Sequence, residues 1–315
     1  MRREARELNA VQVERIQDYH DRMWSTEAYA WSGFKSNKYF ASDRPERLTS
    51  NMERTGTHAG QPLRGVGLEV ETESWGVLNE YALAELMSKV IFPLFPDDLF
   101  KMQHDGSLGG GDCIGVECIT QVMTKAFIRN LYRYFKTMFD VYFPAFKISS
   151  AQSGNCGMHV NLSNALFGDT VDEQAEAIRK LHYIVNRNFT MACRLVGRNP
   201  ERTSYCGQMS YSNARHMSIG GGDHYVCLNY SHFTSGRIEL RLVGGQKNFA
   251  AFRNTMESVF FLVERVRKLR WEDIDDMRKV FRGCNQYVYS RLQLCGLSDE
   301  VLADIRQHVK HEELI

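Results

Sequence analysis

Residues 154–163 read Gly-Asn-Cys-Gly-Met-His-Val-Asn-Leu-Ser, and residues 237–241 read Arg-Ile-Glu-Leu-Arg. Successive side chains of a β-strand point to opposite faces. Each stretch therefore predicts a strand with one apolar face and one polar face. The polar faces carry an imidazole, a carboxylate and two guanidinium groups. Side chains of these types hold divalent cations and phosphate oxygens.

Two earlier stretches show the same alternation. In residues 63–75, Glu69 and Glu71 point to one face of the expected strand and the apolar side chains point to the other. In residues 113–120, Glu117 points away from the apolar side chains in the same way. Each carboxylate taken alone is compatible with a solvent-facing position on a one-sided antiparallel sheet. Four carboxylates on one sheet face would repel one another, and bound cations would remove that repulsion. The repetition on four strands therefore favours a metal and nucleotide site.

The segments between these strands predict an α+β fold. We expect a curved, mainly antiparallel sheet with helices packed on its apolar side. Residues 101–105 predict a further strand, and residues 224–230 and 236–243 predict a hairpin. Apolar residues at helical intervals predict helices over residues 3–23, 79–91, 123–141 and 172–196, and a helical region from about 247 onward.

The chain divides into three parts on this pattern. Residues 1–62 form an N-terminal helix followed by a polar arm, for which an ordered loop, a lid or a partner-contact arm are all open interpretations. Residues 63–270 form the domain that carries these strands, and residues 271–315 form a helical extension. The sequence leaves the oligomeric state open, and a homo-oligomer is compatible with it.

The composition of the 315 residues is that of an ordinary soluble globular protein, with 43% hydrophobic and 24% charged residues. A net charge of +1 gives no reason to expect a nucleic acid or an anionic membrane as partner. The first seven residues are too charged for a signal peptide. The eight cysteines include no Cys-x-x-Cys pair, which disfavours zinc and predicts reduced thiols in a cytoplasm.

The motifs resemble those of a known superfamily. The His159 strand is similar to the Gly-Ser-Gly-Met-His-Val-His-Gln-Ser strand of glutamine synthetases. The segment 237–241, followed by Asn248, is similar to their Arg-Ile-Glu-Val-Arg segment and its following Asn. Three further motifs are the Glu-x-Glu strand at Glu69, the His-Asp-Gly-Ser-Leu run at residues 104–108, and Glu117. The order of all these motifs most resembles the amidoligase family of carboxylate–amine ligases, which is common in phages and bacteria. If the gene belongs to a phage, the expected cytoplasm is that of the host.

The resemblance implies a reaction, its cofactors and its substrates. ATP phosphorylates a carboxylate, and an amine displaces phosphate from the acyl phosphate to give an amide, with Mg²⁺ or Mn²⁺ bound. The acid and the amine are small molecules or peptides. Phosphoryl transfer depends mostly on positioning and charge neutralisation, which metals and arginines supply. The implied metal ligands are Glu69, Glu71, Glu117, His159 and Glu239.

The resemblance also implies roles for other polar residues. Arg237 would contact the nucleotide phosphates, and Arg241 would stabilise the transferring phosphoryl group or the substrate carboxylate. Asp105 would bind the amine or accept its proton, although a turn-forming Asp is an equal alternative. Arg215 is a candidate nucleotide contact, with a plain surface residue as the alternative.

Two departures from the synthetase pattern leave the substrates open. Asn161 stands where the synthetase strand has a second His, and only Glu117 represents a region that carries two metal-binding Glu residues. Ammonia and glutamate are therefore not implied as substrates. Two other classes of protein stay open: a binding or structural protein, such as a phage component, that keeps the fold without catalysis, and a phosphotransferase that acts like a guanidino kinase.

Overall fold

The structure is a computed structural model. It describes residues 38–40, 46–47, 57–58, 61–62, 64–76, 80–105, 107–108, 113–151, 156–220 and 225–314. The helix expected over residues 3–23 lies outside the described residues. The fold is α+β, with a mainly antiparallel open sheet and helices, as the sequence predicted.

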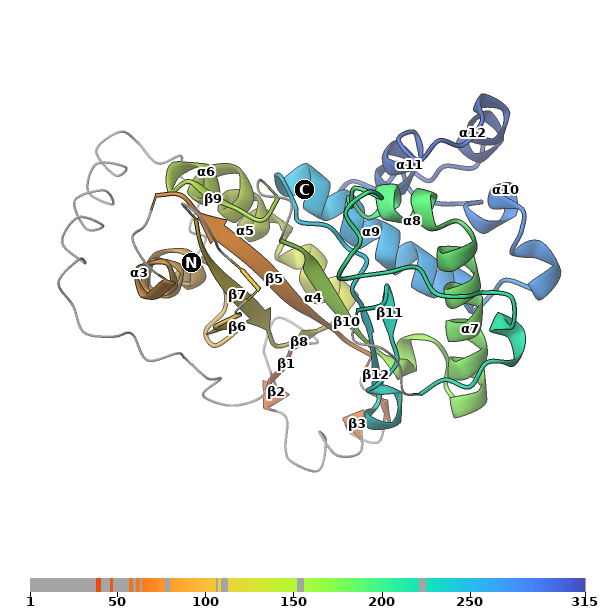
Figure 1. Ribbon diagram of the computed structural model, residues 1–315, viewed down its shortest axis with the longest axis horizontal. Helices are drawn as coiled ribbons and strands as arrows, with labels where there is room; N and C mark the ends of the chain where they lie inside the picture. The colour runs from red at the N-terminus through yellow and green to blue at the C-terminus, as the bar shows by residue number, and fades with distance from the viewer. Residues whose placement is uncertain are drawn as a thin grey trace.

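One mixed sheet organises the described part of the chain (Figure 1). The central strand is β5 (Val66–Ser74), which pairs with β10 (Met158–Ser163) on one side and β7 (Ile114–Thr120) on the other. All pairs between strands of this sheet are antiparallel except the parallel pair β1–β8. Its other strands are β1 (Lys38–Phe40), β2 (Glu46–Arg47), β6 (Phe100–Gln103), β8 (Val122–Met123), β9 (Ile148–Ser149), β11 (Leu228–Asn229) and β12 (Arg237–Leu240), and β3 (Thr57–His58) pairs with β4 (Gln61–Pro62) in a separate ribbon.

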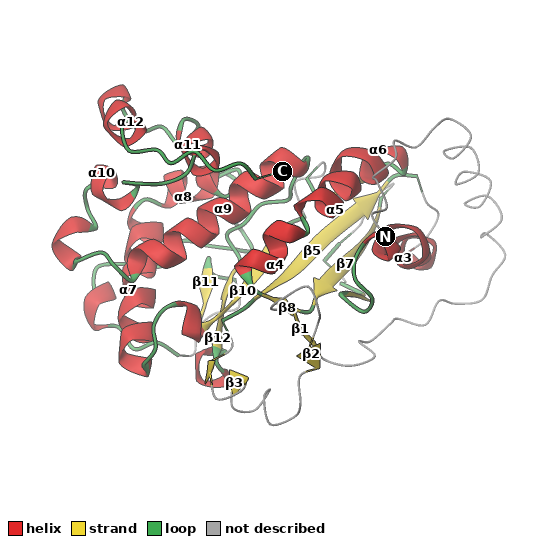
Figure 2. Ribbon diagram, turned by 180° about the vertical axis from the view of Figure 1, so that it is seen from behind, coloured by secondary structure: helices red, strands yellow, loops and turns green. Residues whose placement is uncertain are grey.

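Alternation along the strands gives the sheet two chemically different faces. Leu68, Val160 and Ile238 are fully buried on the apolar face. Helices α4, α5 and α9 lie behind the sheet in Figure 1 and in front of it in Figure 2, so they cover this face. The helices are α3 (Glu80–Leu86), α4 (Lys125–Asn130), α5 (Tyr132–Thr137), α6 (Phe143–Ala145), α7 (Val171–Arg187), α8 (Phe189–Leu195), α9 (Phe249–Val266), α10 (Met277–Val280), α11 (Gln286–Leu292) and α12 (Asp299–Arg306).

Local signals explain where the main helices begin. Thr170 and Glu173 form a capping box, in which each side chain accepts a hydrogen bond from the other residue's backbone N–H, so α7 begins at Val171. Asn248 caps α9 by accepting a hydrogen bond from the N–H of Ala251 at 2.9 Å. Both side chains satisfy backbone N–H groups that have no partner within the helix.

Three expected elements differ in detail. The helix expected over 123–141 is divided at Leu131 into α4 and α5 and then widens into a π-helical turn, and the helix expected over 172–196 is divided at Asn188. The strand expected over 224–230 is reduced to β11. The backbone just before β11 forms its hydrogen bonds with Gly207 instead of with a strand. The N–H of Gly207 donates to the carbonyl of Tyr225, and the carbonyl of Gly207 accepts from the N–H of Cys227.

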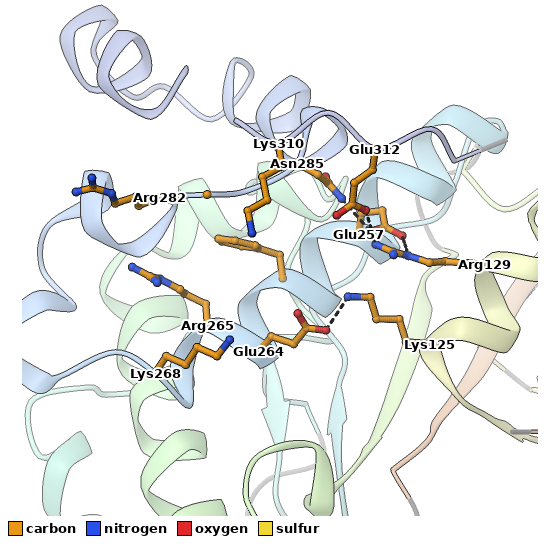
Figure 3. A pocket seen from close by; sticks show the side chains of 12 residues that line it. Lys125, Arg129, Glu257, Glu264, Arg265, Lys268, Arg282, Asn285, Lys310 and Glu312 are labelled. Carbon is orange, nitrogen blue, oxygen red and sulfur yellow. Dashed lines mark hydrogen bonds and ion pairs between the residues drawn. The ribbon is translucent and has the colours of Figure 1, made fainter. Parts of the chain in front are cut away.

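The C-terminal helices dock on α9 through a buried polar network (Figure 3). Glu257 on α9 is 1% exposed and accepts hydrogen bonds from Arg129, from Tyr132 at 2.8 Å and from Asn285 at 3.0 Å. Arg129 also pairs with Glu312 at 3.1 Å. A buried carboxylate requires such partners. The network therefore ties α4, α5, α9 and the C-terminal extension together. None of the described helices combines the length and the apolar character needed to cross a bilayer.

Candidate metal centre

The pairing of four strands gathers the predicted acidic residues on one sheet face. His159 on β10 lies directly opposite Glu69 on β5, and Glu71 lies directly opposite Glu117 on β7. Glu239 on β12 lies opposite Asn161, two residues beyond His159 on the same face of β10. Directly paired residues of antiparallel strands project to the same side. The register therefore brings all five predicted metal ligands together.

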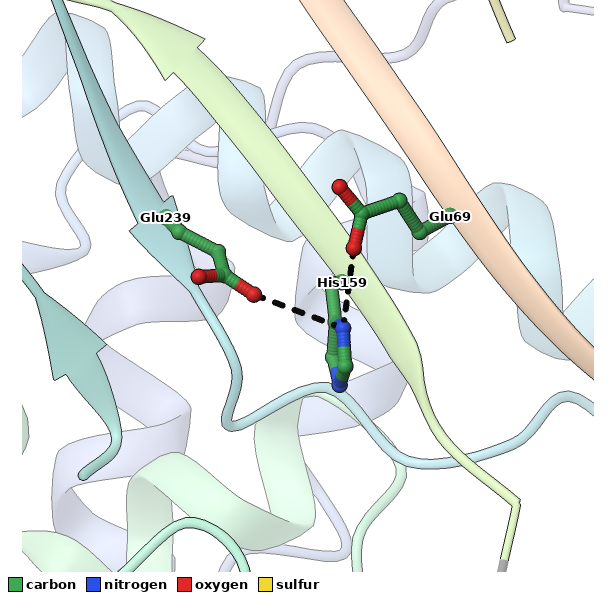
Figure 4. A group of neighbouring side chains, drawn as sticks. All are labelled: Glu69, His159 and Glu239. Carbon is green, nitrogen blue, oxygen red and sulfur yellow. Dashed lines mark hydrogen bonds and ion pairs between the residues drawn. The ribbon is translucent and has the colours of Figure 1, made fainter. Parts of the chain in front are cut away.

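His159 lies between two groups of carboxylates. Its Nδ1 is 3.1 Å from Oε2 of Glu69 and 3.4 Å from Oε1 of Glu239, as Figure 4 shows. Its Nε2 is 3.5 Å from Oε1 of Glu71, which is the neighbour of Glu117. In each group, Glu69–His159–Glu239 and Glu71–Glu117–His159, one ligand atom from each residue lies within 4.8 Å of the others. The geometry therefore offers two adjoining sets of oxygen and nitrogen donors.

Neighbouring polar groups fix the orientation of the carboxylates. Asn161 donates to Oε1 of Glu69 at 2.7 Å, and Asn229 donates to Oε2 of Glu239 at 3.0 Å. Glu71 accepts a hydrogen bond from the backbone N–H of Gly157. Contacts of this kind hold metal ligands in place and tune their basicity. These three carboxylates are therefore positioned before any ligand binds.

The charge of His159 stabilises the nearest carboxylate. Burial would raise the pKa of Glu69, but hydrogen bonds from His159 and Asn161 and the charges of His159 and Arg237 together lower it. Burial would lower the pKa of His159, but its hydrogen bond to Glu69 and the charge of Glu71 raise it above the usual value. The carboxylates thus favour the protonated form of the imidazole in the protein without metal.

The other carboxylates are less well neutralised. Burial raises the pKa of Glu71 and outweighs the charge of His159. Burial, together with the negative charge of Glu69 and Glu71, raises the pKa of Glu117 to about 7. The imidazole of His159 and the guanidinium of Arg241, which pairs with Glu239, are fewer than the four carboxylates of the centre. A divalent cation fits the donor set because it would remove the remaining repulsion.

Arg241 adds a donor that faces the same centre. Its Nη1 donates to Oε1 of Glu239 at 2.7 Å, and the side chain is 10% exposed. Its buried Nε has no hydrogen-bond partner among the described residues. A buried donor without a partner is costly unless a ligand satisfies it. An anion beside Glu239 would do so.

The remaining predicted site residues lie at different distances from the centre. Arg237 is exposed and acts electrostatically on Glu69. Asp105 acts electrostatically on Glu71 and on Glu117. Its side chain also accepts a hydrogen bond from the N–H of Ser107 at 2.8 Å, so it forms the turn in addition to its effect on the two carboxylates.

Arg215 lies elsewhere. Its guanidinium is 5.7 Å from the ring centroid of Trp271 and lines a cavity with Tyr183 and Tyr211. It has no hydrogen bond or ion pair to the metal centre within the described residues. The proposed nucleotide contact of Arg215 therefore stays a prediction without a supporting contact.

The sequence did not single out Arg198. This residue follows Gly197 at the end of α8, and its charge acts on Glu71. It lies in a loop, where no alternation marks one face. The one sequence signal near Arg198 is Gly197, a glycine that ends the helix with a φ of +79°, and it does not indicate a functional residue.

Comparison with known proteins adds little to this geometry. The sequence matches no protein-family model and no curated protein. Among solved structures, it is similar to a bifunctional glutathione synthetase from Pasteurella multocida, with a TM-score of 0.33 and 11% identity. The likeness covers 78% of this chain and 47% of that one, so the chain spans about half the length of that protein. Such a TM-score does not establish a shared fold.

Proposed function

We propose that the protein is an ATP-dependent ligase that joins a carboxylate to an amine and requires Mg²⁺ or Mn²⁺. Its sheet would be a catalytic sheet of the glutamine synthetase type, with the order of motifs found in amidoligases. The observation that carries the proposal is the convergence of Glu69, Glu71, Glu117 and Glu239 around His159, beside the unsatisfied Nε of Arg241.

The two donor sets suggest how the cations are held. Glu69 and Glu239 would hold one ion together with Nδ1 of His159, and Glu71 and Glu117 would hold a second ion beside the ring, while Nε2 of His159 keeps its proton. His159 would then bind as a neutral imidazole, after losing the proton that it carries without metal. The bound ions would neutralise the triphosphate and orient its terminal phosphoryl group.

The arginines would complete the neutralisation. Arg241, held by Glu239, would direct its Nε toward a phosphoryl or carboxylate oxygen. Arg237 is exposed at the start of β12 and would reach the outer phosphates. Charge-assisted hydrogen bonds from guanidinium groups are strong and directional. They would stabilise the charge that develops as the phosphoryl group moves to the substrate carboxylate.

Amide formation would proceed from the acyl phosphate. The amine nitrogen attacks the acyl carbon, the bond from that carbon to the phosphate oxygen breaks, and inorganic phosphate leaves. The nitrogen must lose a proton in this step. Asp105, beside Glu71 and Glu117, would bind the ammonium form and accept that proton.

The test is release of ADP from ATP and Mg²⁺ with a panel of acids and amines. We expect release that requires both an acid and an amine. We expect the Glu239→Ala variant to lose turnover while its circular dichroism stays that of the wild type, because the first donor set is broken. The matched control is Glu264→Ala, which removes an exposed carboxylate from α9.

Other outcomes would assign the protein differently. ADP release with a guanidino compound alone would indicate a phosphotransferase. Nucleotide binding without turnover in any mixture would indicate a binding protein. Full activity of Glu239→Ala would refute the metal assignment.

A further inference from the structure

A cavity of about 470 Å³ lies between the end of α8 and the residues that come after β12. Five basic side chains line it, and no acidic side chain does so among the described lining residues. A cavity of one charge sign attracts ligands of the opposite sign. The five are Arg194, Arg198, Arg202, Lys247 and Arg291.

This cavity adjoins the metal centre. A Cβ atom built on Gly157 would lie 2.8 Å from Nη2 of Arg198 and 3.3 Å from Oε2 of Glu71. The guanidinium in the cavity wall and the carboxylate of the centre therefore approach the same point beside Gly157. Cys156, the preceding residue, itself lines the cavity. A ligand in the cavity would have its inner end beside the metal centre.

Two of the guanidinium groups are held by backbone carbonyls. Arg198 donates from Nε to Leu242 at 2.9 Å and from Nη2 to Val243 at 2.8 Å. Arg291 donates from Nε to Leu195 at 3.0 Å and from Nη2 to Arg194 at 2.7 Å. Carbonyl oxygens orient these groups without cancelling their charge. Burial lowers the pKa of Arg291, so its charge is unfavourable where it lies.

The floor of the cavity is backbone in close contact. A Cβ on Gly245 would lie 1.3 Å from the carbonyl oxygen of Ser150, and one on Gly244 would lie 2.4 Å from that of Gly197. The backbone N–H of Gln246 also donates to Oγ of Ser150 at 2.7 Å. The position of the floor is therefore fixed, and the cavity exists before a ligand binds.

We propose that this cavity binds the acid substrate, and that this substrate is a small di- or tricarboxylate. The inference rests on the proposed function for the role of the ligand as substrate. One carboxylate would lie at the inner end, beside Arg198 and the metal centre, where it can accept a phosphoryl group. The other carboxylates would pair with Arg291 and with the exposed Arg194 and Lys247. A monocarboxylate would leave most of these charges uncompensated.

The experiment measures ligand binding by calorimetry without metal and without ATP. The probes are tricarballylate and, as a single carboxylate, acetate. We expect tricarballylate to bind the wild type more tightly than acetate. We expect at least a ten-fold loss of tricarballylate affinity in the double variant R194Q/K247Q, which removes two exposed charges. The matched control K268Q/R282Q removes two charges from the cavity of Figure 3 and should change affinity less than two-fold.

A separate titration with Mg²⁺ and a non-hydrolysable ATP analogue identifies the occupant. Unchanged nucleotide affinity in R194Q/K247Q supports an acid-substrate cavity. A parallel fall in nucleotide affinity would assign the cavity to phosphates and overturn the proposal. Equal binding of tricarballylate and acetate, or an equal loss in the control, would also overturn it. Failure of the nucleotide to bind any variant would contradict the ligase function, while the tricarballylate result would still report on the cavity.

Discussion

His159 connects the two halves of the candidate metal centre. Its Nδ1 faces Glu69 and Glu239, and its Nε2 faces Glu71. Without metal the ring is favoured in its charged form, because these carboxylates outweigh the effect of burial on its pKa. Metal binding should therefore release a proton from His159, so that the affinity for metal rises with pH.

Glu117 gives a pH-dependent prediction. Its pKa is raised from 4.5 to about 7 in the fold, so its contribution to the stability of the metal-free protein is full below pH 4.5 and is lost as the pH rises through about 7. Glu117→Gln mimics the protonated form. In EDTA at pH 8, we expect the free energy of unfolding of the variant, measured with urea, to exceed that of the wild type by on the order of 2 kcal/mol. At pH 5 the two proteins should unfold at similar urea concentrations. A difference that does not change with pH would contradict this prediction.

Asn229 positions a carboxylate and gives a second prediction. Asn229 is 3% exposed, and its amide holds Oε2 of Glu239. We expect Asn229→Ala to weaken Mn²⁺ binding by about 10-fold, since removal of groups that orient ligands has effects of that size. Calorimetric titration measures the change. Asn188→Ala is the control, because Asn188 bonds to the carbonyl of Ile184 at the α7–α8 junction, and its Mn²⁺ affinity should match that of the wild type.

The strands of the site were the elements most readily predicted from the sequence. Alternation in residues 63–75, 113–120 and 158–163 assigned each acidic or imidazole side chain to a polar face. Alternation does not say which residues are paired, so the opposition of Glu71 and Glu117 required the structure. The division between α4 and α5 could not be predicted either. The apolar residues keep their helical spacing through Leu131, although the ψ of −3° at this residue interrupts the helix.

The interface between α9 and the C-terminal helices gives a prediction about stability. Glu257 has partners on α4, α5 and the C-terminal extension, and its removal would leave Arg129 with Glu312 as its one ion-pair partner among the described residues. We expect Glu257→Ala to lower the free energy of unfolding by about 3 kcal/mol or more, as for other buried ion pairs. Urea unfolding measures the loss. Glu264→Ala breaks the more exposed pair with Lys125 and should cost less than about 1 kcal/mol.

The molecule as a whole should respond to metal, because the ligands come from four strands of one sheet. A ligand that binds only the native state stabilises it by mass action, roughly 2.7 kcal/mol at 100 times its dissociation constant. We expect Mn²⁺ to raise the melting temperature of the wild type above its value in EDTA. Glu239→Ala should lose most of this increase and Glu264→Ala should keep it. An equal increase in all three proteins would place the bound ion outside the centre.

The basic cavity marks the limit of prediction from the sequence. Arg194, Arg198 and Lys247 lie on loops or at a helix end, and Arg291 comes from the C-terminal extension. Periodicity identifies residues that share a face of one element. It gives no signal for side chains that converge from several elements, so this cavity depends on how the helices pack around the end of the sheet.

The order of the strands has a consequence for biosynthesis. Glu69 lies on β5, whereas its neighbours on the sheet face arrive with β7, β10 and finally β12. A nascent chain that ends before β12 has the first carboxylates without Glu239 or the guanidinium that pairs with it. The centre therefore assembles only after the ribosome has translated β12, and a prematurely terminated chain would lack it.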